Sequence, residues 1–214
     1  MRIILFANGD MPHPDQDARL LRPDDFILCA DGGTHHALAL GLTPDLIIGD
    51  LDSSDAAIVA ELRAAGVAIR EFPRDKDYTD LELALQAARE LQPDAILLLG
   101  ALGGRLDQML ANILLLASPD YADLPVTLVS GQEEARVVRD AIELRGRPGD
   151  IVSVIPLTPD VAGLTYGPGL RWRLDDAILP FGSSRGVSNE LVAETASVSL
   201  RSGVILVIHT KNKV

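Results

Sequence analysis

Residues 46–53 read LIIGDLDS, and this stretch decides the fold. Its first three residues, Leu46–Ile48, are apolar and are followed at once by a glycine and two aspartates. A short, continuously apolar run that ends at Gly or Asp is typical of a strand buried on both faces of a parallel sheet. In such sheets, ligands bind beyond the carboxyl ends of the strands. The polar residues that follow the run are therefore candidates for chemistry.

The same pattern recurs along the first 130 residues. Short apolar runs predict buried parallel strands at Ile3–Ala7, Phe26–Ala30, Leu46–Ile48, Val67–Phe72, Ala95–Leu99 and Val126–Val129. Between them, apolar residues at helical spacing predict amphipathic helices with the faces Ile58, Val59, Leu62 and Ala65; Leu81, Ala84, Leu85, Ala88 and Leu91; and Leu106, Met109, Leu110, Ile113, Leu114 and Ala117. This alternation predicts an α/β fold with a doubly wound, mostly parallel sheet and right-handed crossovers.

The sequence changes character after Ser130. Turn clusters such as RPGD at 147–150 separate strand-like pieces, and no helical pattern lies between them. The strand-like pieces are Ala135–Arg139, Ile151–Pro156, Ala177–Phe181, Val198–Leu200 and Val204–Ile208. We therefore expect two domains: an α/β domain over residues 1–130 and a smaller, antiparallel all-β sandwich over residues 131–214.

Composition excludes several classes of protein. Of the 214 residues, 47% are hydrophobic and 23% are charged, which excludes disordered, collagen-like and coiled-coil chains. The net charge of -12 argues against nucleic acid and anionic membranes as partners, since both require a basic surface. The first apolar run is too short for a signal peptide and no stretch approaches the length of a membrane span, so we expect a cytoplasmic protein.

The acidic excess lies in the first domain, where acids follow five successive predicted strands. The loops concerned are Asn8–Asp10, Asp31–Gly33, Gly49–Ser53, Arg74–Asp80 and Gly100–Asp107. Because the carboxyl ends of parallel strands meet at one edge of a sheet, we expect these carboxylates to crowd together. Crowded carboxylates repel one another unless a cation lies among them, and hard oxygen ligands suit Mg²⁺. Asp50 and Asp52, which point the same way in extended backbone, are the clearest pair of ligands.

Several of these residues also have a purely structural interpretation. Thr79 and Glu82 have the spacing of a helix capping box. Asp80 suits both the first turn of a helix and the crevice at the strand ends. The sequence Asp31-Gly32-Gly33 fits a turn as well as a ligand site.

Positive charge is scarce in these loops. Lys76 is either a solvated ion-pair partner of the aspartates that flank it or, together with Arg105, a clamp on a polyphosphate. Neither a Walker loop nor the dinucleotide-binding glycine motif is present, so any phosphates are held in another way. Carboxylates that bridge a metal, one or two cations and glycine-rich loops favour phosphoryl-type transfer. His35 and His36 show no metal-ligand spacing and are expected to be polar residues at the start of a helix.

One segment of the second domain also stands out. Trp172, the only tryptophan, is flanked by two arginines and is either a core residue or an exposed platform for a flat or cationic ring. The loop of residues 182–189 is rich in Gly and Ser and ends in Ser188 and Asn189. This loop either offers short polar ligands or is a plain hairpin connection.

Five motifs resemble, in order and spacing, those of the thiamine pyrophosphokinase family. They are ADGG at 30–33, PDLIIGDLDS at 44–53, DKDYTDLE at 75–82, GGRLD at 103–107 and SSRGVSNE at 183–190, and they cover nearly the whole chain. The resemblance implies transfer of the pyrophosphoryl group of ATP to the hydroxyl of thiamine, which gives thiamine diphosphate and AMP. It also implies a homodimer in which thiamine lies between the α/β domain of one subunit and the β domain of the other.

The resemblance further implies roles for the residues at matching positions. Those around Mg²⁺ and the phosphates would be Asp31, Asp50, Asp52 and Asp80. Those around the nucleotide would be Lys76, Asp77, Thr79, Gly103, Gly104 and Arg105. Those that bind thiamine would be Trp172, Ser188 and Asn189.

The candidates for catalysis are Asp80, Asp107 and Asp52. We favour Asp80 as the group that accepts or orients the proton of the thiamine hydroxyl, with Asp107 close behind. Both a general base and a metal ligand require an ionised carboxylate, so the sequence does not separate the two roles. In two places the chain departs from the family pattern: Gln108 stands where many relatives have His, and Trp172 where bacterial relatives often have Tyr.

Two other functions fit the same residues. A metal-dependent nucleotide phosphohydrolase would use the same acids on water and would release phosphate without an acceptor. A non-catalytic protein that binds thiamine or a nucleotide would be stabilised by its ligand without forming AMP.

Overall fold

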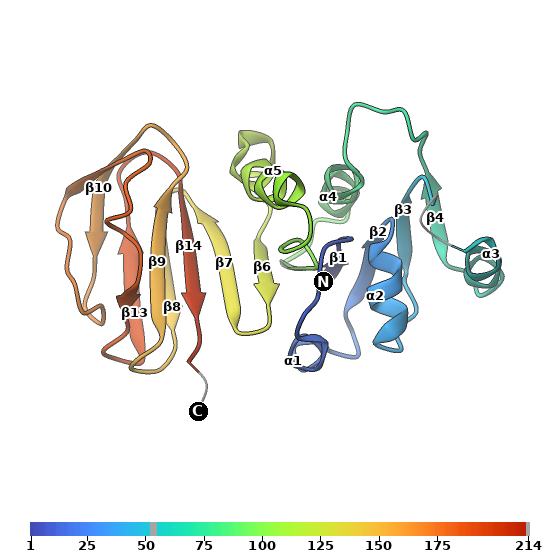
Figure 1. Cartoon of the computed structure of the whole chain (residues 1–214), viewed down its shortest axis with the longest axis horizontal. Coiled ribbons are helices and arrows are strands. Elements are labelled where there is room, and N and C mark those ends of the chain that lie inside the picture. Colours follow the sequence, from blue (N-terminus) through green and yellow to red (C-terminus); the bar gives the residue numbers. More distant parts are fainter. Residues whose placement is uncertain (52–54, 213–214) are drawn as a thin grey trace. The chain divides into compact units, whose positions relative to one another are not determined.

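The computed structural model describes residues 1–51 and 55–212, which divide into the compact units Met1–Gly131 and Gln132–Val214. The first unit holds a parallel sheet with the strand order β6-β5-β1-β2-β3-β4 (Figure 1). Its strands are β1 (Arg2–Phe6), β2 (Phe26–Ala30), β3 (Leu46–Gly49), β4 (Ala68–Glu71), β5 (Ala95–Leu99) and β6 (Val126–Ser130). The predicted parallel α/β sheet is confirmed.

The winding of this sheet reverses at β1. The chain runs outward through β2, β3 and β4, and then returns to place β5 on the other side of β1. This is the topology of a doubly wound sheet. Ligands in such sheets bind in the crevice beyond the carboxyl ends of the strands at the reversal. The crevice of this unit is therefore expected beside the loops that follow β1 and β5.

The central strands are buried, but the edge strand is not. Ile3, Ile4, Leu5 and Phe6 of β1 are all 0% exposed, as continuous apolar runs predict. The expectation of a buried strand is wrong for β4, whose side chains are mostly exposed. Among the described strands, β4 pairs with β3 alone, and its sequence AIRE carries two charged side chains, which suit a solvated edge.

The helices of the first unit are α1 (Pro14–Ala18), α2 (Gly33–Ala39), α3 (Ala56–Ala64), α4 (Asp80–Glu90), α5 (Leu106–Ala117) and the 3-10 turn η1 (Pro119–Tyr121). Helix α4 begins where the sequence predicts: Thr79 Oγ1 accepts a hydrogen bond from the Glu82 N–H at 3.2 Å, so Thr79 is its N-cap. The apolar face of α4 packs on β2 and β3. No helix in the described part of the chain combines the length and apolar character needed to cross a bilayer.

Helix α5 differs from α4, because part of its apolar face is uncovered. Leu106, Leu110 and Leu114 lie four residues apart and are 65%, 49% and 56% exposed. From Gln108 to Ser118 the sequence contains no charged residue. A helix that is apolar on most of its surface is normally buried, so this stripe of three leucines is an uncovered apolar surface of the structure.

The second unit is an antiparallel β-sandwich. One sheet has the order β12-β9-β14-β7 and the other β11-β10-β13-β8. The strands are β7 (Glu133–Val138), β8 (Ala141–Arg145), β9 (Ile151–Pro156), β10 (Asp160–Tyr166), β11 (Ala177–Pro180), β12 (Asn189–Glu190), β13 (Thr195–Ser199) and β14 (Ile205–Thr210). Side chains of both sheets, such as Val152 and Val161, share one hydrophobic core. The predicted smaller all-β sandwich is confirmed.

Candidate active site

Lys76 pairs with aspartates from two strand-end segments of the first unit, and the charge of a third aspartate acts on one of them. Asp31 follows β2, Asp50 follows β3, and Asp80 is the first residue of α4. Lys76 Nζ lies 2.9 Å from Asp80 Oδ1 and 3.9 Å from Asp50 Oδ2. The charges of Asp31 and Asp50 both act on the carboxylate of Asp80. The structure therefore brings together three of the four aspartates predicted to surround a metal; the fourth, Asp52, lies outside the described residues.

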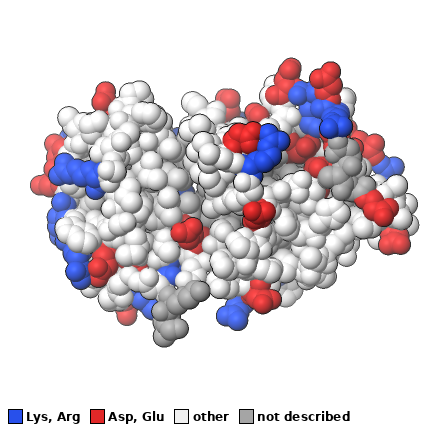
Figure 2. Space-filling view, in the orientation of Figure 1, with Lys and Arg blue, Asp and Glu red and all other residues white. Residues whose placement is uncertain are grey.

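Lys76 is not a solvated surface charge. Its side chain is 12% exposed, and its ion-pair partners are Asp50 and Asp80 rather than its sequence neighbours Asp75 and Asp77. The surface interpretation of this lysine is wrong, because the loop after β4 turns the ammonium group inward onto the strand ends. Figure 2 shows acidic and basic side chains side by side at the end of the first unit where this loop lies in Figure 1.

The backbone around Asp31 explains how the cluster is packed. Asp31 is 7% exposed, and its N–H donates to Ile48 O at 2.7 Å, which ties the end of β2 to β3. A Cβ atom on Gly49 would lie 2.8 Å from Asp31 Cβ, so only glycine allows this approach. Asp31 has φ 43, a left-handed conformation that costs free energy for a residue other than glycine. Such backbone strain is found preferentially at functional sites.

The pKa of Asp80 depends on its burial and on the charges around it. Burial raises the pKa of the Asp80 carboxyl, and the charges of Asp31 and Asp50 raise it further, while the hydrogen bond and charge of Lys76 oppose this shift. The net pKa is raised. Burial is the largest cause of this shift, and a cation bound beside the carboxylates would oppose it by favouring their ionised form.

A cavity of about 370 Å³ opens beside this cluster, beyond the carboxyl ends of β1, β2 and β5. Its polar and glycine lining consists of Asn8, Gly9, Asp10, Asp31, Thr79, Asp80, Gly103, Gly104, Arg105, Gln108 and Asn112. Gly103 and Gly104 have φ values of 84° and 72°, a conformation that residues with a side chain rarely adopt. This wall of the cavity is therefore formed by exposed backbone. The cavity lies where the doubly wound topology predicts a ligand site.

The remaining candidates of the first unit lie differently. Arg105 Nη2 and Nε donate to the two oxygens of Asp107 at 2.6 and 3.1 Å, and both side chains are largely exposed. The hydrogen bonds and charge of Arg105 hold the pKa of Asp107 below its usual value. Asp107 and Asp77 are exposed and do not line the cavity.

Two positioning residues are not identified by the sequence. Asn112 of α5 is 9% exposed, and its Nδ2 donates to Ala101 O at 2.9 Å, which fixes the loop after β5. His36 Nε2 donates to Gly9 O at 2.8 Å, which fixes the loop after β1. A lone polar residue in the apolar run of α5 is a signal for Asn112. Nothing in the sequence around His36, which lies in the first turns of α2 as expected, indicates its partner.

The donor set fits Mg²⁺, although no metal geometry is formed. Carboxylate oxygens are the ligands that Mg²⁺ prefers, and Asp31, Asp50 and Asp80 supply them. Within residues 1–51 and 55–212, no three His, Cys, Asp or Glu side chains converge closely enough to hold a metal ion. Lys76 lies between Asp50 and Asp80, and the fourth predicted ligand, Asp52, lies outside the described residues.

The thiamine-binding candidates of the second unit lie together. Trp172 is 57% exposed, which excludes the core interpretation, and the guanidinium of Arg171 lies 5.7 Å from its ring centre. Asn189 is buried, accepts from Trp172 N at 3.1 Å and donates to Trp172 O at 2.8 Å. Ser188 is exposed, and its N–H donates to Ser153 Oγ at 3.0 Å. Asn189 therefore fixes the backbone that carries the exposed indole.

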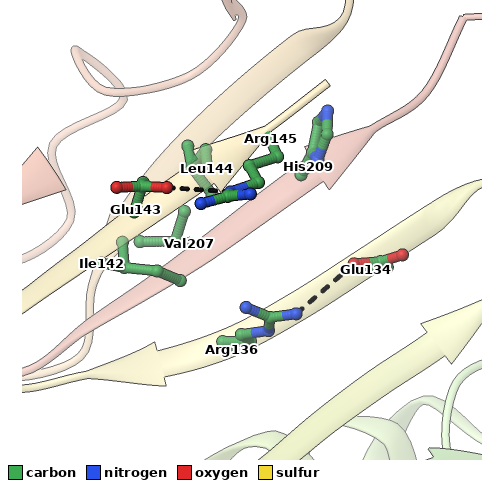
Figure 3. Close-up of a pocket in the computed structure, with 8 residues that line it drawn as sticks. All are labelled: Glu134, Arg136, Ile142, Glu143, Leu144, Arg145, Val207 and His209. Carbon is green, nitrogen blue, oxygen red and sulfur yellow. Dashed lines mark hydrogen bonds and ion pairs between the residues drawn. The ribbon is translucent and has the colours of Figure 1, made fainter. Parts of the chain in front are cut away.

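A second cavity of about 370 Å³ lies within the β-sandwich, and Figure 3 shows its lining. Its charged side chains pair along their own strands, Glu134 with Arg136 at 3.7 Å and Glu143 with Arg145 at 2.9 Å. Opposite charges in its walls thus compensate one another. We therefore place the candidate active site at the strand ends of the first unit.

Comparisons with known proteins agree with this geometry. Residues 18–128 match the family model "Thiamin pyrophosphokinase, catalytic domain", and residues 141–205 match "Thiamin pyrophosphokinase, vitamin B1 binding domain". Thiamine pyrophosphokinase of Bacillus subtilis is 31% identical over 183 residues, which cover 84% of this chain and 85% of that protein.

Solved structures are similar over the whole chain. The crystal structure of the Bacillus subtilis enzyme is 26% identical, with a TM-score of 0.88 and complete coverage of both chains. That of thiamin pyrophosphokinase from Geobacillus thermodenitrificans is 29% identical, with a TM-score of 0.85 over 100% of this chain and 99% of that one. On the agreement of both domain models, the curated relative and these folds, the chain belongs to the thiamine pyrophosphokinase family.

Proposed function

We propose that the protein transfers the pyrophosphoryl group of ATP to the hydroxyl of thiamine, which gives thiamine diphosphate and AMP. The observation that carries this proposal is the cluster of Asp31, Asp50, Asp80 and Lys76, in which Asp31 and Asp80 line a cavity that has glycines in its wall. Transfer of a phosphoryl-type group is catalysed largely by positioning and by neutralising charge. Family membership supplies the identity of the two substrates.

We place the nucleotide in the cavity of the first unit. The backbone of Gly103 and Gly104 forms one wall, and Arg105 and Thr79 line it as well. Exposed backbone N–H groups and a guanidinium are suitable partners for phosphate oxygens. We extend the proposed nucleotide site to Lys76, whose ammonium group faces the same strand ends, and to Asp77 in the neighbouring loop.

We assign the metal site to Asp31, Asp50, Asp52 and Asp80. Mg²⁺ bound there would neutralise charge on the transferred group. The negative charge of the carboxylates would attract the cation, and Lys76 pairs with both Asp50 and Asp80. The nucleotide and metal assignments together make the first unit the catalytic domain.

Asp80 is our candidate for the group that orients and accepts the proton of the thiamine hydroxyl. Asp80 lines the cavity, whereas Asp107 is exposed, does not line the cavity and is paired with Arg105. Asp107 is therefore the weaker candidate, and Asp52 is retained as a candidate next to Asp50. The proposed reaction is an in-line displacement at the β-phosphorus, with AMP as the leaving group.

We assign thiamine binding to the second unit. The exposed indole of Trp172 offers an aromatic face, which attracts flat and cationic rings such as that of thiamine. Ser188 and Asn189 are the proposed polar contacts. Two of the hydrogen bonds of Asn189 already hold the backbone of Trp172, so its contribution would include the orientation of that ring.

We also propose that the enzyme is a cytoplasmic homodimer. The uncovered stripe of Leu106, Leu110 and Leu114 supports the dimer, because an apolar helix surface of this kind is stabilised when a protein partner covers it. The N-terminal turn of α5 also carries Gln108, which lines the cavity. A partner on this helix would thus lie close to the proposed nucleotide site.

The decisive experiment combines the protein with thiamine and Mg-ATP and omits each component in turn. The proposed function predicts equal amounts of AMP and thiamine diphosphate in the complete mixture and neither product in the others. Release of phosphate without thiamine would instead indicate a nucleotide phosphohydrolase. Stabilisation by either substrate without any product would indicate a non-catalytic binding protein.

A further inference from the structure

A buried tyrosine lies under the loop to which we assign thiamine binding. Tyr166 is the last residue of β10 and is 3% exposed. Its hydroxyl has no hydrogen-bond partner within the described residues. An unpaired buried hydroxyl costs free energy that a phenylalanine at the same position would not cost. The hydroxyl therefore calls for a functional explanation.

Tyr166 connects the two segments that carry the thiamine candidates. Its backbone N–H donates to Leu174 O at 3.0 Å, and Arg173 Nε donates to Tyr166 O at 3.0 Å, so its main chain holds the segment that follows Trp172. At the other end of the side chain, the hydroxyl lies close to Gly186: a Cβ atom added to this glycine would be 3.3 Å from the hydroxyl oxygen. The tyrosine thus reaches from the Trp172 segment to the loop of residues 183–188.

That loop is packed tightly against β9. Val154 N donates to Gly186 O at 2.8 Å, and a Cβ on Gly186 would lie 2.2 Å from Val154 O. Ser188, the proposed thiamine contact, has φ 63, a left-handed conformation that costs free energy for a residue other than glycine. The loop therefore combines a strained residue with a buried hydroxyl beneath it that has no partner among the described residues.

We propose that Tyr166 is a positioning residue for thiamine. The hydroxyl of Tyr166 donates a hydrogen bond to the loop of residues 183–188 only when thiamine is bound against Trp172 and Ser188. This inference rests on the proposed function. A ligand shifts a protein between two arrangements only through a difference in free energy between them. The hydroxyl would provide such a difference, because it has no hydrogen-bond partner among the described residues and would gain one in the complex.

The protonation state of the hydroxyl suits this role. Burial raises the pKa of Tyr166 to about 12, with the charge of Arg185 acting in the opposite direction. Tyr166 therefore keeps its proton at neutral pH and remains a hydrogen-bond donor.

The test is the Tyr166→Phe variant of the full chain. Without ligand we expect its Tm to be higher than that of the wild type, because the unpaired hydroxyl is gone. With substrates we expect KM for thiamine to rise about fivefold or more, with kcat and KM for ATP within about twofold, since about 1 kcal/mol corresponds to a factor of five. Tyr121→Phe is the matched control: Tyr121 is 6% exposed, but its hydroxyl donates to Glu82 at 3.3 Å. This control should lower Tm and leave KM for thiamine unchanged.

Thiamine titration without ATP, followed by the fluorescence of Trp172, separates this inference from the proposed function. Binding by the wild type and weaker binding by Tyr166→Phe support both. Equal binding by the two proteins overturns the inference and leaves the proposed function standing. A lower Tm for Tyr166→Phe than for the wild type has the same consequence, because it would show that the Tyr166 hydroxyl is already paired. If the wild type does not bind thiamine, both are overturned.

Discussion

Lys76 Nζ lies 2.9 Å from Asp80 Oδ1, and this ion pair joins the loop after β4 to the first turn of α4. The same ammonium group lies 3.9 Å from Asp50 Oδ2. One lysine thus holds together carboxylates that would otherwise repel each other. The pKa of Asp80 nevertheless remains raised, because burial outweighs the opposing effect of Lys76.

The raised pKa of Asp80 predicts an unusual stability effect. A carboxyl whose folded-state pKa lies above its unfolded value of about 3.8 stabilises the fold fully below that value. This contribution is lost as the pH rises through the folded-state pKa. At pH 7 the Asp80→Asn variant should therefore have a Tm equal to or higher than that of the wild type, and Mg²⁺ should raise its Tm less.

Thermal unfolding at pH 7 with and without Mg²⁺ checks this prediction. Asp75→Asn is the matched control, because Asp75 is exposed in the same loop. A Tm for Asp80→Asn several degrees below that of the control would mean that the Lys76 ion pair outweighs burial and repulsion.

The N-cap of α4 predicts a separation between stability and activity. Thr79→Ala removes the acceptor for the Glu82 N–H and should lower the free energy of unfolding by about 1 kcal/mol. Thr79→Ser keeps the acceptor and should retain most of this stability. If Thr79 serves only as the cap, the two variants will have the same KM for ATP, as measured in parallel with chemical denaturation. A higher KM for Thr79→Ala alone would assign its hydroxyl to the nucleotide as well.

The leucine stripe of α5 predicts which surface forms the dimer. Leu110→Lys places a charge in the middle of the stripe, where Leu110 is 49% exposed, and should convert a dimer into monomers in analytical ultracentrifugation. Ala64→Lys places the same charge on the exposed end of α3 and should leave the dimer intact. A Leu110→Lys protein that sediments as a dimer would show that the interface lies elsewhere.

Local signals in the sequence predict the parts of this structure that depend on local physics. Continuous apolar runs locate the buried strands β1, β2 and β5, and the Thr79 cap locates the start of α4. The sequence misses β10, because a bulge between Val161 and Leu164, with Gly163 at φ 72, interrupts the alternation of apolar residues. It also misses β8, whose apolar residues are interrupted by Glu143, and β12, which has only two residues, both polar.

The candidate site shows the same division. Acidic residues at strand ends indicate where the cluster lies, since parallel strands bring their carboxyl ends to one edge. The partners within the site depend on tertiary structure. Lys76 pairs with Asp50 and Asp80 rather than with its sequence neighbours, and His36 of α2 donates a hydrogen bond to Gly9 in the loop after β1. Helical spacing identifies an apolar face on α5, but it does not show that Leu106 and Leu114 are left uncovered.

The central claim is that the aspartate cluster around Lys76 carries out the transfer. The most direct test is kcat for thiamine diphosphate formation by Asp80→Asn, with Asp75→Asn as the control at saturating thiamine and Mg-ATP. The account predicts a loss of about 100-fold or more for Asp80→Asn, or roughly 2.7 kcal/mol of activation free energy, and a change within about twofold for Asp75→Asn. A kcat for Asp80→Asn within about tenfold of the wild type would contradict it.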